Sequence, residues 1–490
     1  MLPSILHRVG ISLVICCTAC SLRAQTTPKM SPEIQQHIAH VTAGLAPSVV
    51  MKDAPNQAHT LADRMAALHI PGVSIAVIHN GTLQWAQGFG VSSIGGSPVT
   101  PDTLFQAGSI SKPIAAMGTL HLVQQGKLSL DTDVNTQLTS WKLFADPKAN
   151  GKPVTLRELL THTGGTTVHG FPGYAVGEPV PTLVQVLNGE KPANTPPIRI
   201  EAEPGTKWNY SGGGFTIMQQ LVIDTAHQPY PKFLHDTVLG PIGMTHSTYE
   251  QPLTDRRANA ATPYEGDDKP VPGGAHTYPE MAAAGLWTTP TDLSRYALEV
   301  VTSLQGKSNH VLSAEMTKEM LKSGMGHWGL GLEIGGSATK PYFSHGGVNE
   351  GFESLFVTYQ DGSEGAFVMT NAQGGSALAD EIMHSISAEY NWPDYHPVVR
   401  TAVPVDAKIL AAYPGTYELA PTFSLVITFE DGHLAVEPTG QPKLPLFAES
   451  PTRFFLTAVD AEVEFLKDDQ GKVVSLVLHQ GDHEQNAMRK

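Results

Sequence analysis

The spacing of apolar residues changes near residue 400, and this change constrains the fold more than any other feature of the sequence. Upstream, stretches with the 3.6-residue period of helices are mixed with short strand-like runs. Downstream, only strand patterns occur: apolar residues alternate strictly from Phe423 to Phe429, and Asp431-Gly432 supplies a hairpin turn. The chain has 490 residues, so each part is long enough to bury a core of its own.

The sequence therefore predicts two folded domains. Between them, residues 391–404 contain three prolines and no clear periodicity, which is typical of a linker. The predicted boundaries are a signal peptide at 1–24, a domain of mixed helices and strands at 30–390, the linker at 391–404, and a small antiparallel barrel or sandwich at 405–490.

The first domain is predicted to belong to the α+β class. Val73 to Ile78 and Leu83 to Phe89 are strand-like and flank an Asn80-Gly81 turn. Helical patterns follow, strand patterns return between residues 330 and 370, and a last helical pattern precedes the linker. An antiparallel sheet built from both ends of the domain, with a helical insert between them, accounts for this order.

The first 24 residues have the pattern of an export signal. His7 and Arg8 give a weakly positive start, a short apolar run extends from Val9 to Cys20, and Ala24 offers a small residue for cleavage. The run is shorter than the roughly 20 apolar residues that a membrane-spanning helix needs. We expect an exported protein, periplasmic or secreted, with no transmembrane span after cleavage; an uncleaved anchor is the weaker alternative.

The cysteines agree with this interpretation. All three (Cys16, Cys17 and Cys20) lie inside the signal, so a chain cleaved after Ala24 keeps none. That excludes disulfides, cysteine ligands and a cysteine nucleophile from the mature protein. A lipid anchor on Cys20 is a weaker expectation, because the residues before it lack the leucine that is usual in lipoprotein signals.

Charge and composition narrow the possible partners. The formal net charge is −15 and no block of lysines or arginines occurs, so we expect no nucleic-acid partner. The 21 histidines show no HExxH or comparable ligand spacing, so we expect no metal and no other cofactor. The sequence does not indicate an oligomeric state.

Ser109-Ile110-Ser111-Lys112 is the strongest chemical motif. Residues three apart share one face of a helix, so the Lys112 amine can reach the Ser109 hydroxyl. For Lys112 to act as a base, burial or a cationic neighbour must lower its pKa from about 10.4. By itself the motif is also compatible with a helix-capping serine and a solvated lysine.

Five segments in a fixed order resemble class C β-lactamases, penicillin-binding proteins and their esterase relatives. Phe105 to Gly108 resembles the approach to the nucleophile in that family, and Val154 to Gly165 resembles its most recognisable structural signature. The other three segments are Glu203 to Gly212, Ala284 to Leu293 and Ser344 to Gly347. The resemblance covers roughly residues 55–390 and implies a β-lactamase/transpeptidase-like fold.

The resemblance also implies a serine hydrolase that works through an acyl-enzyme. Ser109 would be the nucleophile, and Lys112 and Tyr210 would move protons between nucleophile, leaving group and water. The backbone N–H groups of Ser109 and Val348 would form the oxyanion hole. Substrate contacts would come from Ser211, Gly212, His345, Gly346 and Gly347.

Two positions depart from the β-lactamase pattern. Gly212 stands where the family's second motif has an asparagine that hydrogen-bonds the substrate's acylamino group. His345 replaces the third motif's lysine, a permanent cation that faces a substrate carboxylate. Both changes weaken the recognition of penicillins and of peptide C-termini. An ester or an unusual amide is therefore the favoured small-molecule substrate.

Two alternative functions remain open. One is a β-lactamase, DD-peptidase or D-aminopeptidase that acts on β-lactams or cell-wall peptides, which the export signal favours. The other is a non-catalytic protein that binds a ligand or peptide on the same fold. The presence of Ser109, Lys112 and Tyr210 argues against this alternative.

The roles of several other residues are also left open. His162 lies in the structural signature, so we expect it to be a hydrogen-bonded interior residue and not a catalytic one. Trp85, Trp208 and Trp287 are candidates both for lining the cleft and for packing in the core. The C-terminal segment resembles a domain often appended to these hydrolases and would be either a lid over the cleft or a stability module.

Overall fold

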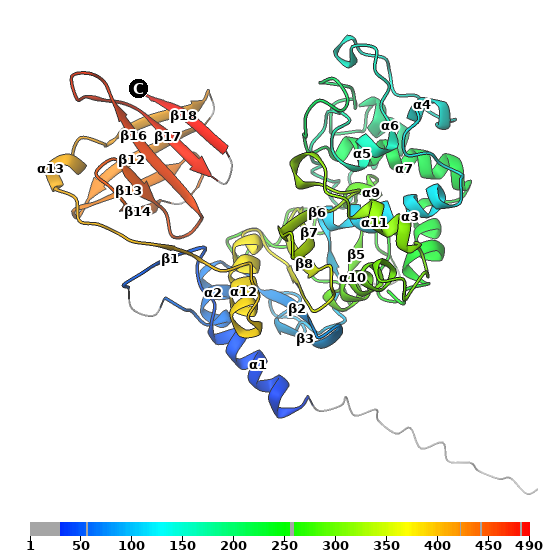
Figure 1. Cartoon of the computed structure of the whole chain (residues 1–490), viewed down its shortest axis with the longest axis horizontal. Coiled ribbons are helices and arrows are strands. Elements are labelled where there is room, and N and C mark those ends of the chain that lie inside the picture. The colour runs from blue at the N-terminus through cyan, green and yellow to red at the C-terminus, as the bar shows by residue number, and fades with distance from the viewer. Residues whose placement is uncertain (1–29, 55–56, 255–258, 422, 442, 481–482) are drawn as a thin grey trace, which may run out of the picture.

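The computed structural model describes residues 30–54, 57–254, 259–421, 423–441, 443–480 and 483–490. It shows a body of helices and strands and, beyond it, a barrel at the C-terminal end (Figure 1). The proposed signal and Cys20 lie outside the described residues. In the described part of the chain, no helix combines the length and the apolar character that crossing a membrane requires.

A six-stranded antiparallel sheet forms the centre of the body. Its spatial order is β3-β2-β9-β8-β7-β6, so strands from both ends of the domain pair in the middle of the sheet. Asn80 and Gly81 both have positive φ in the turn between β2 and β3, as an Asn-Gly hairpin requires. The strands are β2 (Gly72–His79), β3 (Thr82–Gly90), β6 (Glu333–Ser337), β7 (Lys340–Asn349), β8 (Phe352–Tyr359) and β9 (Glu364–Thr370).

Alternate residues of β2 point into two different cores. Val73, Ile75 and Val77 belong to a core shared with helices α1 (Pro32–Ala43), α2 (Leu61–Ala67) and α12 (Gly375–Tyr390). Ala76 and Ile78 belong to the larger core, which contains helix α10 (Pro290–Leu304) and the helical insert. The sheet is therefore covered on both faces, which explains why β2 is apolar almost throughout.

The insert between β3 and β6 carries most of the helices, as the sequence predicted, and Figure 1 shows it on the far side of the sheet from α1. Besides α10, its helices are α3 (Ser111–Gln124), α4 (Val134–Gln137), α5 (Leu156–Leu160), α6 (Leu183–Asn188), α7 (Gly212–Ala226), α8 (Tyr230–Leu234), α9 (Met281–Ala284) and α11 (Ala314–Met320). Its shorter elements are β4 (Phe105–Gln106), η1 (Gly108–Ile110), η2 (Pro147–Ala149), η3 (His235–Leu239), β5 (Trp287–Thr288) and η5 (Met325–His327).

The C-terminal segment is a closed barrel, which decides between the two all-β architectures that the sequence allowed. Eight strands pair consecutively, and β18 closes the barrel on β11. A short helix, α13 (Ala407–Leu410), precedes it. The strands are β11 (Gly415–Ala420), β12 (Phe423–Glu430), β13 (His433–Pro438), β14 (Leu444–Ala448), β15 (Arg453–Phe455), β16 (Ala461–Lys467), β17 (Val473–Gln480) and β18 (His483–Arg489).

The segment predicted as a linker contains a strand. Residues Val398–Arg400 form β10, which pairs in parallel with β1 (Val49–Met51) near the N-terminal end of the body. Arg400 at the end of β10 forms ion pairs with Asp460 and Glu462 of the barrel. The segment therefore connects the two domains by backbone and ionic contacts. A three-residue strand is too short to show an alternating pattern, and the flanking prolines favoured a linker, so the sequence did not predict this strand.

Candidate active site

Ser109 lies in a tight turn that the sequence builds before helix α3. Gly108 has a φ of 52°, a left-handed conformation that glycine adopts without strain. The Ser111 hydroxyl then fixes the turn, because it donates to the Gly108 carbonyl at 2.6 Å and accepts from the Leu286 N–H at 2.9 Å. The nucleophile candidate is thus held by backbone contacts on both sides of the motif.

Lys112 lies directly behind Ser109. Its Nζ donates to Ser109 Oγ at 2.9 Å and to the Ala283 carbonyl at 2.8 Å, and the side chain is only 2% exposed. Burial lowers the pKa of Lys112 to about 7, because the ammonium form loses its hydration. A large fraction of the amine is therefore neutral near pH 7 and able to accept the Ser109 proton.

Tyr210 completes the group around Ser109. Its side chain lines the same cleft as Ser109, and Lys112 Nζ lies 5.0 Å from the centre of its ring. Burial raises the pKa of Tyr210, so the phenol keeps its proton at neutral pH. The structure thus brings Ser109, Lys112 and Tyr210 together around one hydroxyl, in an arrangement suited to passing protons.

His162 supports Tyr210 and stays neutral. Its ring centre lies 4.2 Å from that of Tyr210, and its Nδ1 accepts the Ser211 N–H at 3.1 Å. Burial, together with the charges of Lys112 and His345, lowers the pKa of His162 well below its usual value. The hydrogen-bonded interior position matches what the sequence led us to expect for this residue.

The backbone of strand β7 packs directly against the backbone of the turn that carries Ser109. A Cβ added to Gly108 would come within 2.5 Å of the Val348 nitrogen, and one added to Gly347 would come within 2.0 Å of the Ala107 carbonyl oxygen. Only glycine permits this approach. It places the Val348 backbone nitrogen beside the turn that carries Ser109, where a second oxyanion donor is needed.

A buried amide pair fixes this approach, and the sequence motifs gave no sign of it. Asn349 Nδ2 donates to Gln106 Oε1 at 2.8 Å and to the Ala284 carbonyl at 3.1 Å. Gln106 Nε2 in turn donates to the His276 carbonyl at 2.7 Å. Asn349 follows Val348 and Ala284 follows Ala283, so the pair links the strand of the second oxyanion donor to the helix that receives Lys112.

His345 is buried beside the nucleophile and carries no charge. Its Nδ1–H donates to the Gly346 carbonyl at 2.6 Å, and its Nε2 has no partner among the described residues. Burial and the nearby Lys112 lower the pKa of His345 to about 3. Where the related enzymes place a lysine, this cleft therefore has a neutral ring whose free nitrogen is an acceptor.

Two residues predicted to contact substrate have other roles. The Ser211 hydroxyl accepts the Gly214 N–H at the start of α7 and donates to the Thr167 carbonyl, and the residue is 2% exposed. Gly212 is buried too, and a Cβ added there would lie 2.8 Å from Phe171 Cε2. Neither residue lines the cleft, because Ser211 caps helix α7 and the Phe171 ring lies against Gly212, so substrate binding by these two residues stays a prediction.

Apart from Lys112, which lies behind Ser109, the remaining candidates line one cleft of about 310 Å³. Trp328, Ser376 and Asp380 also line it, and sequence analysis missed them because they come from η5's flank and from α12, outside the motifs. None of the three tryptophans considered from the sequence contributes. The lining residues are Ser109, Tyr210, Trp328, His345, Gly346, Gly347, Val348, Ser354, Leu355, Ser376 and Asp380.

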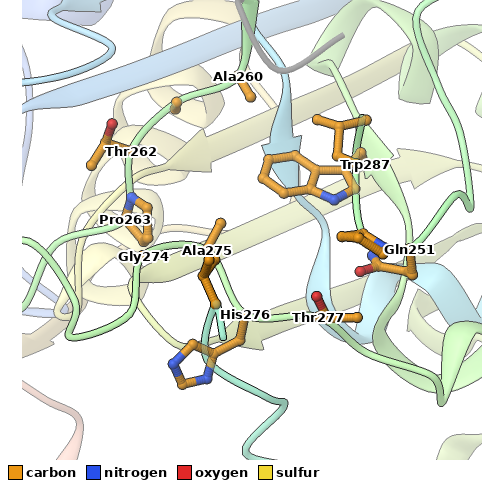
Figure 2. Close-up of a pocket in the computed structure, with 13 residues that line it drawn as sticks. Gln251, Ala260, Thr262, Pro263, Gly274, Ala275, His276, Thr277 and Trp287 are labelled. Atoms are coloured by element: carbon orange, nitrogen blue, oxygen red, sulfur yellow. The ribbon is translucent and has the colours of Figure 1, made fainter. Parts of the chain in front are cut away.

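A second hollow of about 270 Å³ lies elsewhere on the insert. Trp287 lies on its wall, with Gln251 and Thr277 nearby (Figure 2). Among the described residues, none lines both hollows, and those that line this one include no serine, lysine or carboxylate. Across the described ranges, no three histidine, cysteine or acidic side chains gather closely enough to hold a metal ion.

The pH dependence of Ser109 reactivity should follow Lys112. Because the neutral amine is the base, the rate at which a fluorophosphonate labels Ser109 should rise with pH between about 6 and 8, with a midpoint near 7. His345 stays neutral over this range and should contribute no second step. Lys112→Arg, a permanent cation, should label slowly at every pH. A midpoint below 5 in the parent protein would contradict the role of Lys112.

Gly347→Ala should disable the oxyanion hole. The new Cβ would lie 2.0 Å from the Ala107 carbonyl, so β7 must move away from Ser109. Loss of one such donor typically lowers the rate about 10²–10³-fold, and we expect that loss in Ser109 labelling. Gly346→Ala, with 3.8 Å of room, is the control for folding, and both variants should keep a cooperative thermal transition. Unchanged labelling in Gly347→Ala would show that the approach of β7 is unimportant.

Comparisons with known proteins agree with this geometry. The family model described as Beta-lactamase matches residues 58–386, and a domain of unknown function (DUF3471) matches residues 399–489. Penicillin-binding protein 4* of Bacillus subtilis (strain 168) is 24% identical over 474 residues, which are 88% of this chain and 97% of that protein.

Solved structures show the same fold at low identity. The octameric penicillin-binding protein homologue from Pyrococcus abyssi superimposes with a TM-score of 0.60 at 22% identity, covering 87% of this chain and 98% of that one. D-amino acid amidase from Ochrobactrum anthropi SV3 gives 0.53 at 21% identity, covering 67% and 96%. With a family match over most of its length and an intact Ser-Lys-Tyr group, the chain belongs to the β-lactamase family of serine hydrolases.

Proposed function

We propose that the protein is an exported acyl hydrolase that cleaves esters, and amides without a carboxylate beside the scissile bond. The observation that carries this proposal is the neutral, buried His345 at the third motif. A substrate carboxylate finds no fixed cation there. The Phe171 ring beside Gly212 adds to the argument, because it fills the space in which an asparagine would hold an acylamino group.

The proposed reaction transfers an acyl group from the substrate to water. Neutral Lys112 takes the Ser109 proton as the hydroxyl oxygen attacks the carbonyl carbon, and the backbone N–H groups of Ser109 and Val348 hold the oxyanion. The leaving group departs with a proton passed through Tyr210. Water then attacks the acyl-enzyme, loses its proton to the same group, and Ser109 is restored.

The two alternative functions are weakened by different observations. Carboxylate recognition by a β-lactamase or a DD-peptidase needs a donor that His345 does not offer in its present tautomer. A purely binding protein has no need of a lysine buried against a serine at 2.9 Å. Amides stay within the proposal, since one structural neighbour is a D-amino acid amidase.

Paired substrates test this proposal. Residues 25–490 and the Ser109→Ala variant should be compared on a short p-nitrophenyl ester and a chromogenic cephalosporin. We expect ester kcat/KM to exceed cephalosporin kcat/KM by at least about 100-fold and to fall by at least about 10³-fold in Ser109→Ala. The far-ultraviolet circular dichroism of the variant should be unchanged. Rapid cephalosporin turnover would reject the substrate preference, and equal activity in both proteins would reject the nucleophile.

Export is a separate part of the proposal. It rests on the apolar run from Val9 to Cys20 and on the confinement of all cysteines to the first 20 residues. When the full chain is expressed in a Gram-negative host, intact-mass analysis should find a periplasmic species beginning near Gln25. A chain that keeps Met1 in the cytoplasm would refute cleavage, and a diacylglycerol mass on Cys20 would favour the lipid anchor.

A further inference from the structure

The catalytic cleft carries one charged side chain, and it is negative. Asp380 is the only charged residue among the described residues that line the cleft. His345 is neutral there, and Lys112 is turned away from the cleft toward Ser109 Oγ and the Ala283 carbonyl. A substrate therefore meets a carboxylate and no opposing fixed cation when it approaches Ser109.

Asp380 is rigidly placed and has no partner. It lies in the second turn of α12, whose first turn is held by Glu353 of β8: the Gly374 and Ser376 N–H groups donate to that carboxylate at 3.1 and 2.7 Å. The next residue, Glu381, is paired at 2.7 Å with Arg64. Asp380 itself is exposed, with no hydrogen bond or ion pair to any described residue. Its carboxylate remains available for a ligand.

An aromatic wall stands in the same cleft. Trp328 and Tyr210 have ring centres 5.8 Å apart, and Trp328 lies 5.4 Å from the His345 ring. Aromatic faces attract ammonium groups through their negative electrostatic potential, and together with a carboxylate they form a common binding site for alkylammonium ions. A cleft of about 310 Å³ places such a group within one small molecule's length of Ser109.

The third motif offers no hydrogen-bond donor or cation to a substrate carboxylate. His345 Nδ1 donates its proton to the Gly346 carbonyl, and Nε2 is buried without a partner among the described residues. The Asp380 charge repels a carboxylate and attracts an ammonium group. The electrostatic preference of the cleft is thus opposite to that expected for penicillin recognition.

We propose that the protein selects ester or amide substrates that carry a protonated amine or a quaternary ammonium, with Asp380 and Trp328 as the specificity-determining residues. This inference rests on the proposed hydrolase function and names its substrate class.

Matched substrates that differ in one charge test the inference. On the leaving-group side, acetylcholine is compared with 3,3-dimethylbutyl acetate. On the acyl side, the p-nitrophenyl ester of 4-(trimethylammonio)butanoate is compared with that of 5,5-dimethylhexanoate. In at least one pair, kcat/KM should favour the cation by roughly 5- to 10-fold, as expected for one solvent-screened charge pair. Raising the salt concentration to about 1 M should reduce this ratio.

The variants separate charge recognition from folding and from chemistry. Asp380→Asn should bring the ratio to within about twofold of unity, chiefly by lowering kcat/KM for the cationic ester of the pair. Trp328→Phe should keep part of the preference. Asp469→Asn, which removes an exposed carboxylate of the barrel, should retain all of it. Binding of tetramethylammonium, followed by tryptophan fluorescence, should weaken in Asp380→Asn.

The outcomes distinguish failure of the ammonium site from failure of the proposed hydrolase function. Ser109-dependent hydrolysis with no charge preference in either pair, or with a preference that survives in Asp380→Asn, would overturn the ammonium site and leave the hydrolase proposal standing. If no ester or amide is cleaved, the hydrolase proposal fails. In that case the fluorescence titration with tetramethylammonium still decides whether Asp380 binds ammonium. A saturable fluorescence change in the parent protein that is lost in Asp380→Asn supports the site. If the parent protein shows no saturable change, the site is rejected.

Discussion

The buried contact between Lys112 Nζ and Ser109 Oγ is the interaction on which the rest of the site depends. An ammonium group loses its hydration when it is buried, and here only a hydroxyl and the Ala283 carbonyl replace the lost water. The burial that would destabilise a charged lysine lowers its pKa to about 7 and makes it a base at neutral pH. Each element around it, from the nucleophile turn to α9 and the Tyr210 ring, keeps water away from this one amine.

The surroundings of this contact differ from the pattern that the resemblance to penicillin-binding enzymes implies. Related enzymes place a cation and an amide where this protein has the neutral His345 and the Phe171 ring beside Gly212. The one charge that the described cleft residues add is the Asp380 carboxylate. The motifs hold the reacting atoms, whereas Ser376 and Asp380 of α12 line the cleft from outside the motifs, so in our proposal acyl transfer and the choice of substrate are carried by different parts of the fold.

The position of the barrel indicates its role. None of the described residues that line the catalytic cleft comes from it. Its connections run instead through β10 to β1 and through Arg400 to Asp460 and Glu462. In Figure 1 it lies beyond β1, on the side of the body opposite the helices of the insert. Of the two roles considered from the sequence, a stability module fits these contacts better than a lid.

The sequence by itself determined the two-domain order, the α+β class, and the pairing of Ser109 with Lys112, whereas the role of Tyr210 was implied by the resemblance to a known family. These features are local: hydrophobic period, an Asn-Gly turn, and a three-residue spacing that one turn of helix brings together. It did not show that Ser211 and Gly212 are buried away from the cleft, and it did not find Asn349, Trp328 or Asp380, because spacing does not show which side chains meet across distant elements. Only the tertiary structure decided that α12 brings a carboxylate to the cleft, that the His345 ring is neutral, and that burial tunes Lys112. Each of these depends on which atoms replace water around a group, and that is fixed by packing between residues hundreds of positions apart.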